Sequence, residues 1–171
     1  LSLLRNVRRY EPIVTELKVP ELSVPGRLLL PQRSSIEVLP PRNVPLIVVS
    51  HGLGSNRETY RYLGETLAQA GFVVAMIEHT GSNDRQLLNL QEGLVDAVVE
   101  DVEFIRRPLE VSWTLDAIAQ ATRTGALRGL VNLREIGLIG QSFGGYTALA
   151  AAGADISSEA FDQSCLPQPP V

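Results

Sequence analysis

The sequence has a single cysteine, only two histidines and no excess of positive charge, and each shortage excludes a class of protein. The lone Cys165 rules out an internal disulfide framework and a zinc site built from several cysteines, and we assign it no role. Two histidines are too few for a His-rich metal cluster, so no metal is expected. The net charge of −4 gives no attraction to phosphate groups, which argues against nucleic-acid binding. No apolar run approaches the roughly 20 residues that cross a bilayer, so no integral membrane segment is expected.

What the sequence does contain is enough apolar residues for one folded domain. Its 171 residues are 44% hydrophobic, which fits a single domain over residues 1–171. Residues 1–44 hold short apolar runs at 13–19, 24–30 and 36–39, separated by prolines. Because proline cannot donate to a strand ladder, such runs favour edge strands and their connections. We predict an N-terminal antiparallel meander here.

Residues 45–154 alternate between strand-like and helix-like patterns. Continuous apolar runs are typical of strands buried on both faces, and they occur at 46–49, 72–77 and 136–139. Apolar residues at helical spacing predict helices at 60–70, 94–105, 111–121 and 145–152, with Pro108 separating the second from the third. This order predicts an α/β protein, with a mostly parallel sheet and helices on both faces.

Residues 155–171 show no strand pattern and end in a proline-rich stretch. The chain begins without a methionine, and the sheet counted above is short for this architecture. We therefore expect an irregular tail and a C-terminally incomplete domain, so that the chain is a fragment.

The segment Gly140-Gln141-Ser142-Phe143-Gly144 fits the pattern G-x-S-x-G between a predicted strand and a predicted helix. In such a turn the serine has a strained backbone, and side chains two residues away on either side would collide, so glycine occupies both places. The turn lifts the serine hydroxyl above the strand ends. It also directs the N–H of the next residue, Phe143, toward developing negative charge. We predict that Ser142 is a nucleophile.

A second glycine-rich loop, His51-Gly52-Leu53-Gly54, follows the predicted strand at 46–49. A tetrahedral intermediate needs two hydrogen-bond donors, and the second normally comes from a loop after an earlier strand of the same sheet. Glycines on both sides of Leu53 allow its backbone N–H to approach a substrate oxygen. Leu53 and Phe143 are therefore the predicted backbone donors of an oxyanion hole.

The segments "SHGLGSNRETY", "GFVVAMIEHTGSN" and "IGLIGQSFGGYTAL" together resemble the α/β-hydrolase superfamily. More narrowly, they resemble its platelet-activating-factor acetylhydrolase and predicted dienelactone hydrolase branch, over about residues 45–151. The resemblance implies an α/β-hydrolase fold and a serine esterase with Ser142 as nucleophile and Leu53 and Phe143 as oxyanion donors. Gln141 departs from the histidine that many relatives carry there. Dienelactone hydrolases use cysteine as nucleophile, so Ser142 argues against that particular activity.

The base and acid that activate such a serine are not evident in the sequence. In α/β hydrolases both follow the serine, whereas His51 and His79 precede it. We expect the His51 side chain to order its loop, and we do not favour His79 as the base. The carboxylates that follow the serine lack a strand to place them, and we expect each to face solvent: Asp155, Glu159 and Asp162. Either the triad acid and histidine lie outside this chain, or the site is a relic.

Two further features have alternative interpretations. The charges at Glu100, Asp101, Glu103, Arg106 and Arg107 are predicted to form a solvated helix face rather than an acid–base pair. Aromatic and aliphatic residues nearby, Trp113 and Leu115, are predicted to pack in the core rather than to line an acyl pocket.

The sequence therefore predicts that the parent protein hydrolyses carboxylic esters, with short acyl groups or on a lipid, through an acyl-enzyme on Ser142. No cofactor is required, because water is the second substrate. The chain alone, without a base, is expected to be aggregation-prone and inactive. The alternative is a non-catalytic binding protein that reuses the fold.

Overall fold

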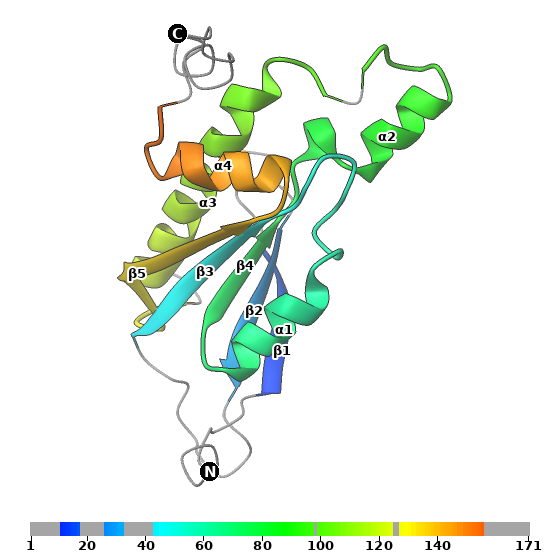
Figure 1. Ribbon diagram of the computed structural model, residues 1–171. Helices are drawn as coiled ribbons and strands as arrows, with labels where there is room; N and C mark the ends of the chain where they lie inside the picture. Colours follow the sequence, from blue (N-terminus) through cyan, green and yellow to red (C-terminus); the bar gives the residue numbers. More distant parts are fainter. Residues whose placement is uncertain (1–10, 18–25, 33–42, 98, 125–126, 156–171) are drawn as a thin grey trace, which may run out of the picture.

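The computed structural model describes residues 11–17, 26–32, 43–97, 99–124 and 127–155, which form one five-stranded sheet with helices on both faces (Figure 1). The strands are β1 (Glu11–Leu17), β2 (Gly26–Gln32), β3 (Val44–Ser50), β4 (Val73–Ile77) and β5 (Val131–Gly140). The helices are α1 (Arg61–Gln69), α2 (Asp84–Gln91), α3 (Glu103–Thr124) and α4 (Phe143–Ala151), with a short 3-10 helix, η1, at Thr80–Ser82.

The strand order is β1-β2-β4-β3-β5. Strand β3 pairs in parallel with β4 on one side and β5 on the other. Strand β2 pairs antiparallel with β4, and β1 pairs antiparallel with β2. The predicted α/β class and the antiparallel N-terminal strands are confirmed, and the third run predicted at 36–39 lies outside the described residues.

The two faces of the sheet bury separate apolar clusters. On one face α1 packs Ala68 and Leu67 against residues that include Val49 and Met76. On the other face α3 packs Val111 and Ile118 against the apolar strand side chains that point to that face. Ala151 of α4 packs against the same cluster. Strands β3 and β4 are buried on both sides, which explains why their sequences are continuously apolar rather than alternating. The carboxyl ends of the parallel strands therefore form one edge between the helical layers.

The helix predicted at 94–105 is wrong for most of its length, because α2 ends before it and α3 begins only at Glu103. Helix α2 is capped by Asn83, whose side chain accepts a hydrogen bond from the N–H of Gln86. It ends just before Gly93, which adopts a φ of 70°. The described residues from there to Val102 form turns and bends, and α3 begins at Glu103. A polar cap and a glycine stop thus outweigh the apolar spacing.

The predicted break at Pro108 is also wrong, because this proline lies inside α3. A proline lacks the N–H that would bond to the carbonyl four residues earlier, here that of Phe104. The Tyr146 hydroxyl from α4 donates to this carbonyl oxygen at 3.1 Å, which supplies the missing partner. Helix α3 therefore tolerates its proline and is joined to α4 at the same point.

Helix α3 is the longest described helix, at 22 residues. No helix among the described residues is both long enough and apolar enough to cross a membrane.

Candidate active site

Ser142 lies between β5 and α4 with φ 53° and ψ −121°. Among the described residues, only Asn43 and Ser142 combine a positive φ with a side chain. A serine in this region is strained, and such strain persists only where the surrounding structure holds it. The backbone at Ser142 thus has the sharp strand-to-helix turn that the sequence predicts.

Gly140 and Gly144 leave no room for a side chain. A Cβ at Gly140 would lie closer than 3.0 Å to the carbonyl oxygen of Gly144. A Cβ at Gly144 would lie closer than 3.0 Å to the carbonyl oxygens of Ser50 and His51. Both glycines are therefore required by close backbone approach, and the second contact joins the start of α4 to the end of β3.

The loop after β3 and the turn after β5 leave the sheet side by side, because Ser50 is paired with Gly140. A Cβ on Gly52 would lie 2.5 Å from Oε1 of Gln141, so the two segments are in direct contact. The Gly54 N–H donates to the carbonyl oxygen of Ser82 at 3.0 Å, which fixes the far end of the loop. The structure thus brings the segments that carry Leu53 and Phe143 together at the carboxyl edge of the sheet.

The backbone N–H groups of Leu53 and Phe143 make no hydrogen bond with another described residue. The N–H of Phe143 is the first of helix α4, and the side chain of the capping residue, Ser142, makes no capping hydrogen bond. Free N–H groups at such a position can donate to an anionic oxygen. The arrangement therefore offers two donors from neighbouring segments.

His51 is buried, and both of its ring nitrogens are occupied. The N–H of His79 donates to Nε2 of His51 at 3.0 Å. The ring proton is therefore on Nδ1, which lies 2.7 Å from the carbonyl oxygen of Gly52. Burial lowers the pKa of His51, which agrees with a neutral ring. His51 orders the loop, as the sequence predicts, and it makes no hydrogen bond to Ser142.

His79 belongs to a buried chain of hydrogen bonds that the sequence does not reveal. Its Nε2 lies 2.8 Å from Oγ of Ser50, and its Nδ1 lies 2.5 Å from a carboxyl oxygen of Glu110. Burial, followed by the charges of Arg107 and His51, lowers the pKa of His79 well below its usual value. Burial raises the pKa of Glu110 to about 7. Both nitrogens of His79 are thus engaged away from Ser142.

The charged residues at 100–107 form the predicted solvated face only in part, because Glu100, Asp101 and Arg106 are exposed whereas the other two are buried. Glu103 and Arg107 are buried, with 1% and 0% of their surface exposed, while Arg106 lies outside and donates to Glu103 at 2.8 Å. The buried residues of α3 recur at helical spacing: Glu103, Arg107, Glu110, Val111, Thr114 and Ile118. That spacing, which includes two clearly apolar positions, is the signal that could have identified Arg107 as an inward residue.

The remaining sequence predictions have mixed outcomes. Trp113 and Leu115 pack against the apolar cluster under α3, which confirms that they belong to the core. Asp155 follows α4 and is exposed. The other carboxylates proposed after the serine, Glu159 and Asp162, lie outside the described residues, as does Cys165. Among the described residues, no group of three or more His, Cys, Asp or Glu side chains could hold a metal ion.

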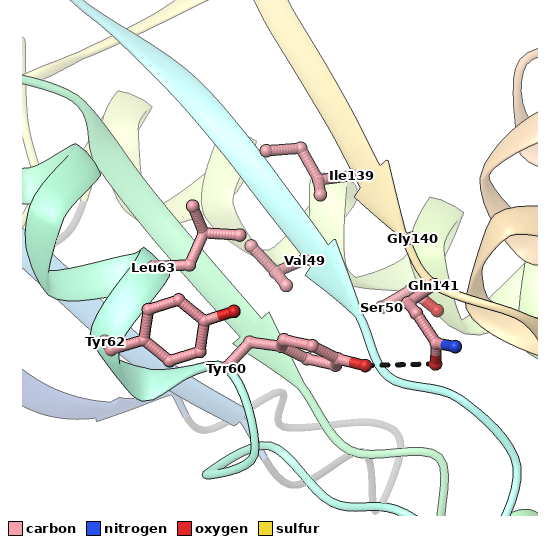
Figure 2. A pocket seen from close by; sticks show the side chains of 8 residues that line it. All are labelled: Val49, Ser50, Tyr60, Tyr62, Leu63, Ile139, Gly140 and Gln141. Atoms are coloured by element: carbon pink, nitrogen blue, oxygen red, sulfur yellow. Dashed lines mark hydrogen bonds between the residues drawn. The ribbon is translucent and has the colours of Figure 1, made fainter.

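A pocket of about 120 Å³ lies beside the turn, on the face of the sheet that α1 covers (Figure 2). The hydroxyl of Tyr60 donates to Oε1 of Gln141 at 3.0 Å. The pocket is lined by Val49, Ser50, Tyr60, Tyr62, Leu63, Ile139, Gly140 and Gln141. Ser142 is not among these residues, so this pocket does not by itself identify a substrate site.

Residues 13–106, more than half of the chain, match the family described as platelet-activating factor acetylhydrolase, isoform II. The chain belongs to this family. The matched range includes the loop at His51–Gly54 but stops before Ser142.

Two curated relatives are platelet-activating factor acetylhydrolases. The dog protein is 30% identical over an alignment of 143 residues, and the match covers 65% of this chain and 32% of the relative. The guinea pig protein is 23% identical over an alignment of 159 residues, and the match covers 76% of this chain and 36% of the relative. The chain thus spans about a third of the length of these relatives.

A solved structure, dienelactone hydrolase from Anabaena variabilis, matches 84% of this chain and 57% of its own, with a TM-score of 0.51 and 23% identity. At this identity the likeness concerns the fold alone. The predicted α/β-hydrolase fold is therefore confirmed, as is the resemblance to the platelet-activating factor acetylhydrolase branch.

The buried carboxyl of Glu110 predicts a pH-dependent stability. Its pKa, raised from 4.5 to about 7, makes the native state bind more protons than the unfolded state between these values. The free energy of unfolding contributed by this group therefore falls as pH rises from 4.5 to about 7. A Glu110→Gln variant loses this titration, so its stability relative to the parent protein should rise over that window, by at most about 3 kcal/mol.

Urea unfolding at several pH values between 4.5 and 8 measures this difference. Ser112→Ala, at an exposed position without a titrating group, is the control and should change stability by the same amount at every pH. The groups that act on the Glu110 carboxyl are Glu103, Arg106, Arg107 and His79, and all remain in both proteins. A pH-independent difference for Glu110→Gln would contradict the raised pKa.

Proposed function

We propose that this chain is part of a serine esterase, that Ser142 is its nucleophile, and that the N–H groups of Leu53 and Phe143 form its oxyanion hole. The observation that carries the proposal is the backbone of Ser142. It holds a φ of 53° between two glycines in close backbone contact, next to a loop with a free N–H. Strain of this kind is retained where a side chain must be held in one position for chemistry.

In the proposed reaction, the Ser142 hydroxyl oxygen attacks the ester carbonyl carbon while a base removes the hydroxyl proton. The carbonyl oxygen becomes an anion, which the N–H groups of Leu53 and Phe143 stabilise by hydrogen bonds. Collapse of this intermediate releases the alcohol, which takes up the proton, and leaves an acyl group on Ser142. Water then attacks the acyl-enzyme by the same route and releases the carboxylic acid.

The base and its acid are proposed to come from outside these 171 residues. The chain has only two histidines. His51 is committed to Gly52 and to the backbone of His79, and His79 to Ser50 and Glu110. Freeing either ring would leave buried groups without partners, which costs free energy. The chain alone is therefore proposed to be inactive toward esters.

The substrate is proposed to be a carboxylic ester with a short acyl group, carried on a small molecule or a lipid. The support is family membership, since relatives are named for hydrolysis of the acetyl group of platelet-activating factor. Ser142, in place of a cysteine, also supports an esterase over the dienelactone hydrolase activity named for the solved structure.

A fluorophosphonate probe tests this assignment, because it modifies only an activated serine. The protein encoded by the whole reading frame should be labelled stoichiometrically, with the modified peptide containing Ser142. The Ser142→Ala variant should not be labelled. If the probe labels both proteins equally, Ser142 is not the nucleophile. If neither is labelled, the fold serves binding rather than catalysis.

A further inference from the structure

The guanidinium of Arg107 is buried against the end of β3. None of its residue surface is exposed, although it carries a charge near the start of α3. Its Nη2 donates to the carbonyl oxygen of His51 and lies 3.4 Å from Oγ of Ser50. The His51 carbonyl belongs to the peptide that begins the loop carrying Leu53. Arg107 thus holds the first peptide of that loop through a buried hydrogen bond.

The same guanidinium also contacts the turn after β5. Its Cζ lies 4.4 Å from the centroid of the Phe143 ring. The ring is confined on other sides by Phe104, with centroids 4.9 Å apart, and by Tyr146, at 5.7 Å. A cation over an aromatic face is attracted to it, and the attraction is strong where water is excluded. Arg107 therefore fixes the side chain of the residue whose N–H is the second proposed donor.

One planar group thus touches both segments that carry the proposed oxyanion donors. We propose that Arg107 is a positioning residue that sets the separation of the Leu53 and Phe143 N–H groups. The proposal rests on the proposed function, because it assigns a role within that oxyanion hole. Arg107 does not act on substrate directly, since none of its surface is exposed.

The chemistry of the site favours arginine over any other residue. A guanidinium can donate in its plane to the His51 carbonyl while its flat face lies on the Phe143 ring, and an ammonium cannot do both. Its Nε and Nη1 have no partner among the described residues. Burying such a charge costs stability, which the nearby carboxyls of Glu103 and Glu110 only partly offset. Because the buried guanidinium lowers stability, a role in the site explains it better than a role in folding.

Transition-state affinity distinguishes positioning from a purely structural role. In the protein encoded by the whole reading frame, Arg107→Met should lower kcat about 100-fold with KM changed by less than about 3-fold, the scale expected when one donor is misplaced. A trifluoromethyl ketone, which forms an oxyanion on Ser142, should bind about 100-fold more weakly. An ether analogue of the substrate, which forms none, should bind within about 3-fold of the parent value.

Two further variants complete the experiment. Arg107→Lys keeps one donor but not the planar contact, so its kcat and ketone affinity should fall about 10-fold. Arg123→Met, at an exposed position on the same helix, should match the parent protein in every measurement. If Arg107→Met does not fold, the same comparison of ketone and ether affinities in Arg107→Lys tests the proposal. Ketone and ether affinities that fall together, or an unchanged kcat, would overturn the proposal.

The Ser142→Ala variant distinguishes failure of the proposed function from failure of the positioning role of Arg107. If it retains turnover, the proposed function fails and the role of Arg107 fails with it. If it is inactive while the Arg107 variants keep the parent kcat and ketone affinity, only the positioning role is overturned.

Discussion

Ser142→Ala should lower ester turnover by at least roughly 10⁴-fold in the protein encoded by the whole reading frame, with little change in its folding. The expectation follows from the proposed acyl-enzyme, because no other hydroxyl can replace a lost nucleophile at the same point. The oxyanion donors and substrate binding would remain, and loss of a triad member typically leaves a residual rate about 10³–10⁴-fold above that in water. The residual rate should thus be small but measurable.

Hydrolysis of p-nitrophenyl acetate and of a lipid acetyl ester measures this loss. Ser112→Ala is a matched control, because Ser112 is an exposed serine on α3 whose hydroxyl donates only to the carbonyl oxygen of Pro108. That variant should keep the parent rate. Turnover within about 10-fold of the parent value in Ser142→Ala would exclude the acyl-enzyme, since this mechanism predicts a far larger loss.

The fold was predictable from the sequence where local and tertiary preferences agree. The apolar runs of β3 and β4 are buried on both faces, and nothing in their flanking sequence competes with a strand. The turn at Ser142 was predictable for the same reason, because its two glycines have no other explanation than close packing. Both signals are local, so a single sequence is sufficient to detect them.

The course of the chain between α2 and α3 was not predictable from apolar spacing. The stripe at 94–105 has helical spacing, yet the cap at Asn83 and the positive φ of Gly93 place helix α2 before it. The tolerance of α3 for Pro108 depends on the Tyr146 hydroxyl, 38 residues further along the sequence. A long-range partner of this kind has no signature in the local sequence.

The support of the candidate site was missed for a related reason. Charged residues are mostly solvated, so Glu103 and Arg107 were expected at the surface, and Glu110 was assigned no role. Their burial depends on His79 and on the end of β3, which lie far away in the sequence. The residues proposed to contact substrate were therefore found from motifs, whereas the residues that hold them required the three-dimensional structure.

Gly144→Ala should reduce both stability and activity, because the added methyl group meets backbone rather than a movable side chain. Its Cβ would lie closer than 3.0 Å to the carbonyl oxygens of Ser50 and His51. Either β3 or the start of α4 must shift to relieve this overlap. Overpacking of this kind costs about 1–3 kcal/mol. The shift would also separate the Leu53 and Phe143 N–H groups, and a displacement of about 1 Å can cost about 100-fold in kcat.

Gly145→Ala provides the matched control one residue further along. A Cβ there would lie 3.5 Å from the carbonyl oxygen of Gly140, an ordinary van der Waals contact. Alanine also favours a helix over glycine by about 1 kcal/mol, so this variant should be at least as stable as the parent protein and retain its kcat. Thermal unfolding and kcat for both variants decide the question. If the two alanines behave alike, helix propensity alone governs the turn, and the close contact between α4 and β3 does not hold the two donor segments in place.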